Sequence, residues 1–307
     1  MKKSISTVLL FLAAIIWGVA FSAQKAVESV PPFTLGAARS LLASIFLIFV
    51  ILIFDKANGQ GRRLFSKEKK VDLNRHELIG GILCGVALAL ASFFQQAGIN
   101  GGTSAGKASF ITALYVIIVP VYALCLKKRA PINVWVSIAI ALFGFYLLCI
   151  TGDFKIVASD LLVIVAALIF PVQILAIDKF SPMCDGVRMS LVQFATATAV
   201  NLVLALILES PIAFSAVWSA VLPIIFLGIG SSGIAYTLQI IGQKGVNPAV
   251  ASLILSLESV FGVVGSAILL KEKMTLREYA GSAIVFVAVI LSQLDFKALF
   301  AKRNKKN

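Results

Sequence analysis

Two ionisable side chains stand out because they fall inside long apolar segments of the sequence. Glu258 lies near the midpoint of the run 245–270, and Arg39 lies early in the run 29–54. An ionisable group at the centre of a membrane helix costs about 2.5–3.5 kcal/mol on insertion scales, so it is expected to have a specific role. For Glu258 that role is either a carboxylate that contacts a solute or accepts a proton, or a protonated packing residue hydrogen-bonded to a serine.

The guanidinium of Arg39 supports two interpretations. Its planar fork of N–H donors suits a carboxylate or another anion, so one interpretation is an anion clamp. The other is a structural cation, which either reaches the headgroup region or pairs with Glu258 or a helix C-terminus. The sequence leaves both interpretations open.

Catalytic and metal-binding patterns are not recognisable in the sequence. His76 is the one histidine, and the four cysteines form no C-x-x-C pair, so no Cys/His metal site is predicted. The glycine-rich segment before Lys107 lacks the G-x-x-x-x-G-K-[ST] pattern of a nucleotide-binding loop. A membrane-embedded enzyme needs a nucleophile, a metal or a carboxylate cluster. We therefore expect no catalytic residue, no metal and no cofactor.

The elements that carry these residues are predicted to be membrane-spanning helices. Apolar residues make up 60% of the 307-residue chain and charged residues 13%, and the mean hydropathy is +1.00. Soluble chains are about 45–50% apolar and about 25% charged, so a water-soluble fold is excluded. A membrane barrel would show alternating strands of about ten residues rather than solid apolar runs. Ten runs long enough for a helix are 4–24, 29–54, 78–106, 108–126, 130–152, 161–177, 189–208, 210–243, 245–270 and 279–294.

The charges predict the orientation of these helices. Lysine and arginine number 27 against 14 acidic residues, a net charge of +13. Basic residues gather in the loops on the side of the two termini, and such loops stay in the cytoplasm. We therefore expect a multi-pass protein of the cell membrane with both termini cytoplasmic and an uncleaved first helix. The basic excess is a topology signal, and no nucleic-acid partner is predicted.

The two halves of the sequence resemble each other. Residues 108–114 read ASFITAL and residues 251–257 read ASLILSL, with four of seven positions identical. An ordered series of such matches indicates an internal repeat. Each half holds five predicted helices, so the second half enters the membrane with opposite polarity. The predicted fold is all-α, with ten transmembrane helices as two inverted-topology five-helix repeats, 1–152 and 153–296, followed by a basic cytoplasmic tail, 297–307.

Alignment of the halves places polar candidates in matching positions. A glutamine inside a helix bundle either binds a solute or ties helices together, so these residues are candidates for a solute pathway rather than assigned ligands. The matched pairs are Tyr115 with Glu258, Arg39 with Gln193, and Gln95 with Gln239, and Tyr236 lies shortly before Gln239.

The first helix of each half carries an aromatic residue beside a helix-weakening one. Trp17-Gly18 and Phe170-Pro171 occupy corresponding places. Glycine or proline interruptions at matching positions of two repeats indicate a solute site between them. The alternative is ordinary packing, because glycine and proline are common in membrane helices and an aromatic ring can face lipid.

The sequence resembles the EamA-type branch of the drug/metabolite transporter superfamily, with two copies of its five-helix unit. That resemblance implies ten helices, cytoplasmic termini and transport of small metabolites, and it does not fix the solute. The stretches that carry it are IWGVAFSAQK (16–25), PPFTLGAAR (31–39), TSAGKASFITALYVIIVP (103–120), SLILSLESVF (252–261) and LLKEKMTLREYAG (269–281).

From repeat and resemblance together we expect a secondary-active transporter. It would move a small metabolite, amino-acid-like or another small polar or amphipathic solute, by alternating access at a midplane site. A facilitative exchanger or a channel-like permease without ion coupling is the alternative, and a membrane-embedded enzyme fits less well. The expected partners are the solute, the lipid bilayer and protons as a coupling ion. Monomer and dimer both stay open.

Overall fold

The computed structural model describes residues 3–57, 74–149, 157–212, 214–269 and 275–293, and within these ranges it contains helices and no strand. Nine helical segments are long and apolar enough to cross a membrane, and the shorter apolar helix Ile132–Leu147 accompanies them. The predicted all-α membrane fold is confirmed. In chain order the elements are α1 (Lys3–Ala26), α2 (Pro32–Ala57), α3 (Arg75–Asn100), α4 (Ala105–Ala113), α5 (Tyr115–Cys125), α6 (Ile132–Cys149), α7 (Ala158–Phe180), the 3-10 turn η1 (Ser181–Met183), α8 (Gly186–Leu208), α9 (Phe214–Ser219), α10 (Val221–Ile225), the π-helical segment η2 (Phe226–Ala235), α11 (Tyr236–Gly242), α12 (Pro248–Leu255), α13 (Glu258–Leu269) and α14 (Leu276–Gln293).

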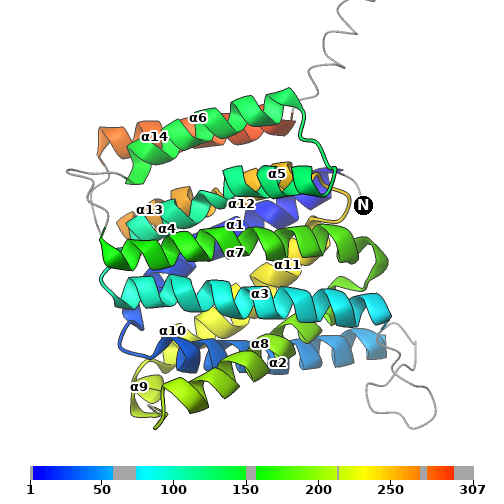
Figure 1. The fold of residues 1–307 in the computed structure, drawn as a ribbon, viewed down its shortest axis with the longest axis vertical. Coiled ribbons are helices and arrows are strands. Elements are labelled where there is room, and N and C mark those ends of the chain that lie inside the picture. The colour runs from blue at the N-terminus through cyan, green and yellow to red at the C-terminus, as the bar shows by residue number, and fades with distance from the viewer. Residues whose placement is uncertain (1–2, 58–73, 150–156, 213, 270–274, 294–307) are drawn as a thin grey trace, which may run out of the picture.

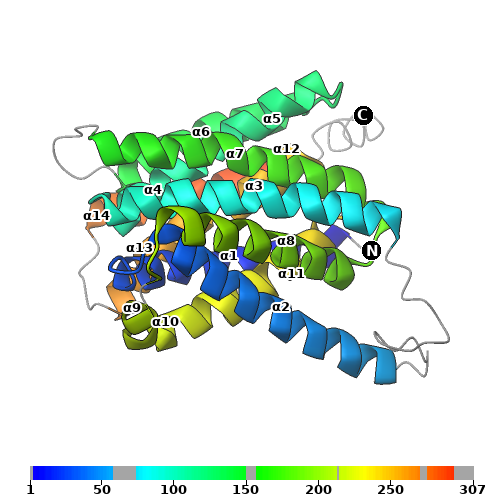
Figure 2. The same cartoon turned by 60° about the horizontal axis from the view of Figure 1, so that its bottom comes forward.

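The helices run side by side through one bundle (Figure 1). The pair α6 and α14 forms one edge, and α2 with α8 forms the opposite edge, as Figure 2 also shows for α6 and α2. Helix α1 begins and α14 ends at the same end of the bundle. We call this the terminal end and the opposite one the far end.

Packing between helices repeats in the two halves. Helices α2 and α8 pack together, and so do α6 and α14, and each of these pairs joins corresponding helices of the two halves. The broken helices pack crosswise, with α5 on α12 and α4 on α13. The contact of α3 with α7 has its counterpart in the contact of α1 with α11 and η2. Likewise, α7 packs on α4 and α5 as α1 packs on α12 and α13. The two five-helix repeats therefore interlock around one centre.

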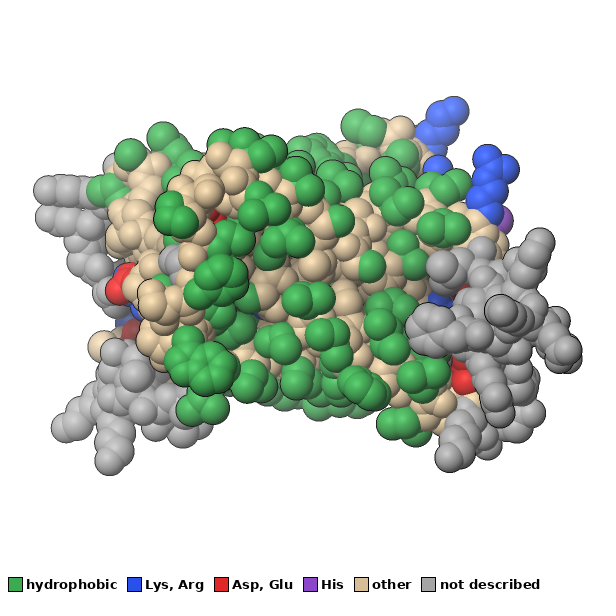
Figure 3. Space-filling view, turned by 90° about the horizontal axis from the view of Figure 1, so that it is seen from below, with side chains coloured by type: hydrophobic (Ala, Val, Ile, Leu, Met, Phe, Trp, Pro, Cys, Tyr) green, Lys and Arg blue, Asp and Glu red, His purple; other side chains and the backbone are tan. Residues whose placement is uncertain are grey.

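The outer surface of the bundle is apolar between its ends. Large apolar side chains are exposed along the helices, among them Phe49, Ile53, Leu206 and Ile207. On the face in Figure 3, charged side chains lie at the two ends and hydrophobic ones spread between them. Soluble proteins rarely expose so much contiguous apolar surface to water. This band is the surface that faces lipid.

The fourth helix of each repeat is broken at the same place. The sequence predicts each of them as one continuous run. In the structure the first consists of α4 and α5, separated at Leu114, and the second consists of α12 and α13, separated at 256–257. At each break the leucine N–H donates to the carbonyl three residues earlier: Leu114 to Ile111 and Leu257 to Ile254, both 3.2 Å. These tight turns end one half-helix and start the next.

The helix-weakening residues Gly18 and Pro171 do not interrupt the first helix of either half. Helix α1 runs through Gly18, and α7 runs through Pro171, without a break. A proline removes one hydrogen-bond donor, and packed neighbours let a membrane helix continue past it. The breaks therefore lie in the fourth helices, next to Tyr115 and Glu258.

The predicted run 210–243 holds less regular helix than expected. After the short α9, a single span, Val221–Gly242, consists of α10, η2 and α11. The centre of η2 is rich in glycine and serine, GIGSSG at 228–233. Such residues allow the wider π turn, which is frequent at functional sites.

A carboxylate holds α2 and α8 together at each end of the bundle. At the terminal end, Asp55 at the end of α2 accepts two hydrogen bonds of 3.1 Å from Arg188 in the first turn of α8. At the far end, Glu209 after α8 accepts bonds of 2.7–2.8 Å from the backbone of Phe33 and Thr34 and from the Thr34 hydroxyl. We call these two contacts the α2–α8 clamps.

Candidate functional site

A central cavity lies where the broken helices meet α1, α2, α3, α7 and the η2–α11 segment. It encloses about 520 Å³ of empty space, its opening included. Gly18, Pro171 and Gln193 are not on its wall. Eight of the eleven candidates from the sequence line it: Trp17, Arg39, Gln95, Tyr115, Phe170, Tyr236, Gln239 and Glu258.

The two break residues face the cavity with incomplete hydrogen bonding. Tyr115 opens α5 and Glu258 opens α13, and their side chains are 4% and 5% exposed. The Tyr115 hydroxyl and the Glu258 carboxyl interact with each other, but within the described part of the chain neither Tyr115 Oη nor Glu258 Oε1 forms a hydrogen bond of regular geometry. A buried polar atom left in this state costs about 1–3 kcal/mol. The start of α13 offsets part of the cost for Glu258, because a helix N-terminus favours negative charge.

Arg39 is held by the π-helical segment. Its Nε donates to Ser232 Oγ at 3.0 Å and its Nη2 to Ser231 Oγ at 3.1 Å. Neighbouring residues of an α-helix point in different directions, so the altered turn of η2 helps both hydroxyls reach one guanidinium. The alternative of a pair with Glu258 is not formed, because no ion pair among the described residues joins the two.

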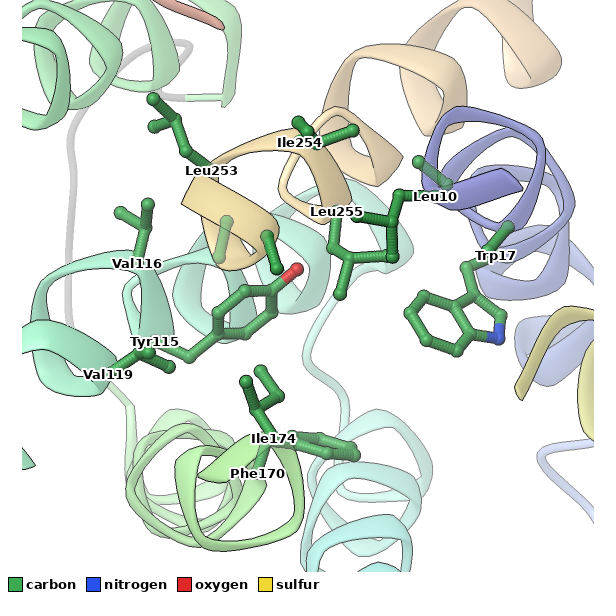
Figure 4. Packing of buried hydrophobic residues seen from close by; sticks show 14 of the residues in the cluster. Leu10, Trp17, Tyr115, Val116, Val119, Phe170, Ile174, Leu253, Ile254 and Leu255 are labelled. Carbon is green, nitrogen blue, oxygen red and sulfur yellow. The ribbon is translucent and has the colours of Figure 1, made fainter. Parts of the chain in front are cut away.

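Aromatic rings form one wall of the cavity. The Trp17 and Tyr236 ring centres lie 4.5 Å apart, and the Tyr236 ring packs edge-on against Phe194 at 5.7 Å. The Trp17 indole N–H donates to the Ser231 carbonyl at 3.2 Å, so the ring is fixed in place. Figure 4 shows the Tyr115 and Trp17 rings on either side of Leu255, which lies between them.

Phe170 closes the cavity on the side of α7. It lies beside Ile174 on the same helix, below the Tyr115 ring in Figure 4. Both side chains line the cavity. The cavity therefore combines aromatic and aliphatic walls with a few polar groups, which is typical of small-molecule sites.

Gln95 ties three helices together at the far-end side of the cavity. It accepts a bond from Gln24 of α1 at 3.0 Å and donates one to Thr112 of α4 at 2.9 Å. All three side chains line the cavity. The set can therefore hold helices together and also present amide groups to a solute.

Gln239 belongs to a matching set in the second half. Gln173 of α7 donates to Gln239 at 3.1 Å and to Gln193 at 3.3 Å. Gln193 is fully buried behind this contact and is absent from the wall. The counterpart of Arg39 therefore serves the packing between α7, α8 and α11.

Gly18 is a packing position behind the cavity wall. A Cβ built on it would lie 2.5 Å from Phe261 Cβ and 2.7 Å from the Gly262 nitrogen, because α1 and α13 approach closely here. We expect Gly18→Ala to lower the free energy of unfolding by about 1–3 kcal/mol, as overpacking does. Thermal unfolding in detergent measures it. Gly106→Ala is the matched control, since a Cβ there meets nothing within 4 Å; equal stability of the two variants would contradict the tight contact.

The candidates derived from the sequence did not include several polar wall residues. Gln24, Thr112, Gln173 and Ser231 line the cavity. Gln24 and Gln173 could not be identified from the sequence, because a single sequence does not distinguish a glutamine that faces a cavity from one that faces the lipid headgroups. The GIGSSG segment was a usable signal for Ser231, since glycine and serine weaken regular α-helix. Within the described ranges no group of three or more His, Cys, Asp or Glu side chains could hold a metal.

Comparison with known proteins agrees with this architecture. The model of the EamA-like transporter family matches residues 4–150 and again residues 157–294. An uncharacterized transporter of Archaeoglobus fulgidus is 27% identical over 293 residues, which is 93% of this chain and 84% of that protein. A solved crystal structure shares the fold, with a TM-score of 0.73 and 18% identity over 94% of this chain and 95% of the other. The chain belongs to the EamA-like transporter family, as a membrane transporter with two copies of the family unit.

Proposed function

We propose that the protein is a secondary-active transporter that moves a small metabolite by alternating access at the central cavity. The observation that carries this proposal is the pair of matching helix breaks, which bring Tyr115 and Glu258 to one cavity. Discontinuous helices at the interface of two repeats are the usual construction of a transporter site. The solute is amino-acid-like or otherwise small and polar or amphipathic, because the wall pairs aromatic rings with charged and amide groups.

An ion pair joins the two halves at the far end. Lys107 in the first turn of α4 pairs with Asp160 in the first turn of α7, and Thr103 donates to Asp160 at 2.9 Å. The Asp160 side chain is buried. We call this contact the far-end latch. Because it joins the first turns of α4 and α7, we expect that it must separate for the cavity to open to the far end.

A solute panel in reconstituted vesicles tests the proposal. Uptake and efflux of labelled amino acids and other small metabolites are measured with and without a pH gradient. We expect accumulation of at least one solute that collapses when the gradient is dissipated. Equilibration without accumulation would support uncoupled exchange instead.

The orientation of the protein is part of the proposal. Loops on the terminal-end side carry most of the lysine and arginine, which places that end in the cytoplasm. In a variant whose own cysteines are replaced by serine, single cysteines at Ser66 and Lys302, both outside the described residues, should resist an impermeant thiol reagent added to intact cells. A cysteine at Ser210 should react. Labelling of Ser66→Cys from outside would reverse the orientation.

A further inference from the structure

Arg39 carries a buried positive charge that forms no ion pair with a carboxylate among the described residues. Its side chain is 8% exposed. Its two hydrogen bonds go to the neutral hydroxyls of Ser231 and Ser232. A buried charge without a counter-charge is costly. A bound anion would offset the cost of burying this charge.

The guanidinium stands where two cavities meet. The central cavity lies on one side, and a second, much smaller cavity lies between α2, α3, α8 and η2. Arg39 and Ser92 line both. The second cavity adds Asn201 and Ser232 to its wall and contains no carboxylate.

Part of the guanidinium is available to a ligand. An arginine has five N–H donors, and two are used by the serines. Nη1 donates to no described residue, yet it is not among the sealed, unpaired atoms of the interior. Nη1 therefore keeps some accessible surface, and Arg39 lines both cavities together with Ser92.

We infer that Arg39 binds a small anionic group, with Nη1 and the free hydrogen of Nη2 as donors. The inference rests on the proposed function and deepens it, because the carboxylate of a transported solute and a co-bound halide are the two sources of such an anion. Two parallel N–H donors match a carboxylate well. The repeat counterpart of Arg39 is the neutral Gln193, which is occupied with Gln173, so the site exists in one half.

Glu258 and Tyr236 line the same cavity as Arg39. The Tyr236 phenol is within electrostatic reach of both Arg39 and Glu258. If Glu258 balanced the arginine across the cavity, the protein would gain nothing from an added anion. The two possibilities therefore differ in a measurable way.

Thermal unfolding of the purified protein in detergent tests the inference. The protein is placed in a chloride-free HEPES buffer and titrated with sodium chloride, sodium acetate, sodium benzoate or phenylalanine. Benzamide and phenylalaninamide serve as probes that lack the carboxylate. We expect at least one anion to raise the unfolding temperature and both amides to leave it unchanged. Stabilisation by carboxylates identifies the anion as the solute's own, and stabilisation by chloride alone identifies a halide.

Three variants assign the effect to this residue. Arg39→Gln should lower the affinity for the stabilising anion by about tenfold or more, since a charge-assisted hydrogen bond is lost. Arg39→Lys keeps the charge without the fork and should retain part of the response, which guards against a glutamine variant that does not fold. Arg277→Gln, outside the cavity, should respond as the unmodified protein does. No response of the unmodified protein to any anion, or an unchanged response in Arg39→Gln, overturns the inference.

The test separates the anion site from transport. Anion-dependent stabilisation in a protein that moves no solute in vesicles would keep the site and remove the proposed function. Transport without any anion response would keep the proposed function and remove the site.

Discussion

Replacing Glu258 by glutamine is expected to abolish solute accumulation driven by a pH gradient. Glutamine keeps the volume and much of the hydrogen bonding of the carboxyl group and loses its exchangeable proton. Glu258 begins α13 beside the cavity, and its Oε1 forms no hydrogen bond of regular geometry with a described residue, so it can exchange a proton when the cavity opens. Counterflow exchange and protein yield should stay near their original levels. Initial accumulation rates in vesicles, with and without the gradient, measure the effect.

Glu28→Gln is the control for this substitution. Glu28 is an exposed carboxylate near the far end that pairs with Lys25, so its loss should change neither assay. Folding of Glu258→Gln should survive, because no ion pair with Arg39 is broken. Unchanged gradient-driven accumulation in Glu258→Gln would remove the coupling role and leave a packing carboxyl.

A covalent cross-link across the far-end latch is expected to stop transport almost completely. Lys107→Cys with Asp160→Cys places two thiols where α4 and α7 meet, and a short bifunctional thiol reagent then holds the two helices together. The cavity can then open at one end only. The transport rate should fall by about tenfold or more on cross-linking. A tenfold fall corresponds to raising the free energy of the far-end-open state by about 1.4 kcal/mol. A reductant that cleaves the linker should return the transport rate to the value that the same protein had before it was cross-linked.

The α2–α8 clamps supply the matched control for this experiment. Asp55→Cys with Arg188→Cys is cross-linked in the same way, between helices that are held at both ends of the bundle. We expect α2 and α8 to move together, so this link should leave most of the transport rate. Equal inhibition by both links would show that any restraint stops the protein, and the latch would lose its special role.

The architecture was predictable because its signals are long. Each helix was read from a run of about twenty apolar residues, a length that the bilayer imposes. The repeat added the pairing of halves, and the described part of the chain shows nine helical segments long enough to span a membrane, one shorter apolar helix, and contacts that repeat between the halves. The breaks at Leu114 and 256–257 were not predicted, because each lies inside an uninterrupted apolar run. Ser252 and Ser256 bond to carbonyls three residues back, and such bonds can bend helices, but a serine in an apolar run is also an ordinary packing residue of membrane helices.

The site residues that could be predicted are those whose charge is unusual inside an apolar helix. Glu258 and Arg39 stood out because charge is rare in a membrane helix, and both line the cavity. Gly18 and Pro171 were chosen for helix weakening, which does not decide which face of a helix meets the cavity. Their aromatic neighbours, Trp17 and Phe170, are on the wall. Their roles in binding stay predictions.

Access to the cavity from each side of the membrane tests the central claim most directly. Ser92, which lines both cavities, is replaced by cysteine in a variant that lacks the protein's own cysteines. An impermeant thiol reagent is added to right-side-out and to inside-out vesicles. Alternating access predicts labelling of Ser92→Cys from both sides. Labelling from one side only, or passage of the reagent into the lumen as through a pore, would contradict it.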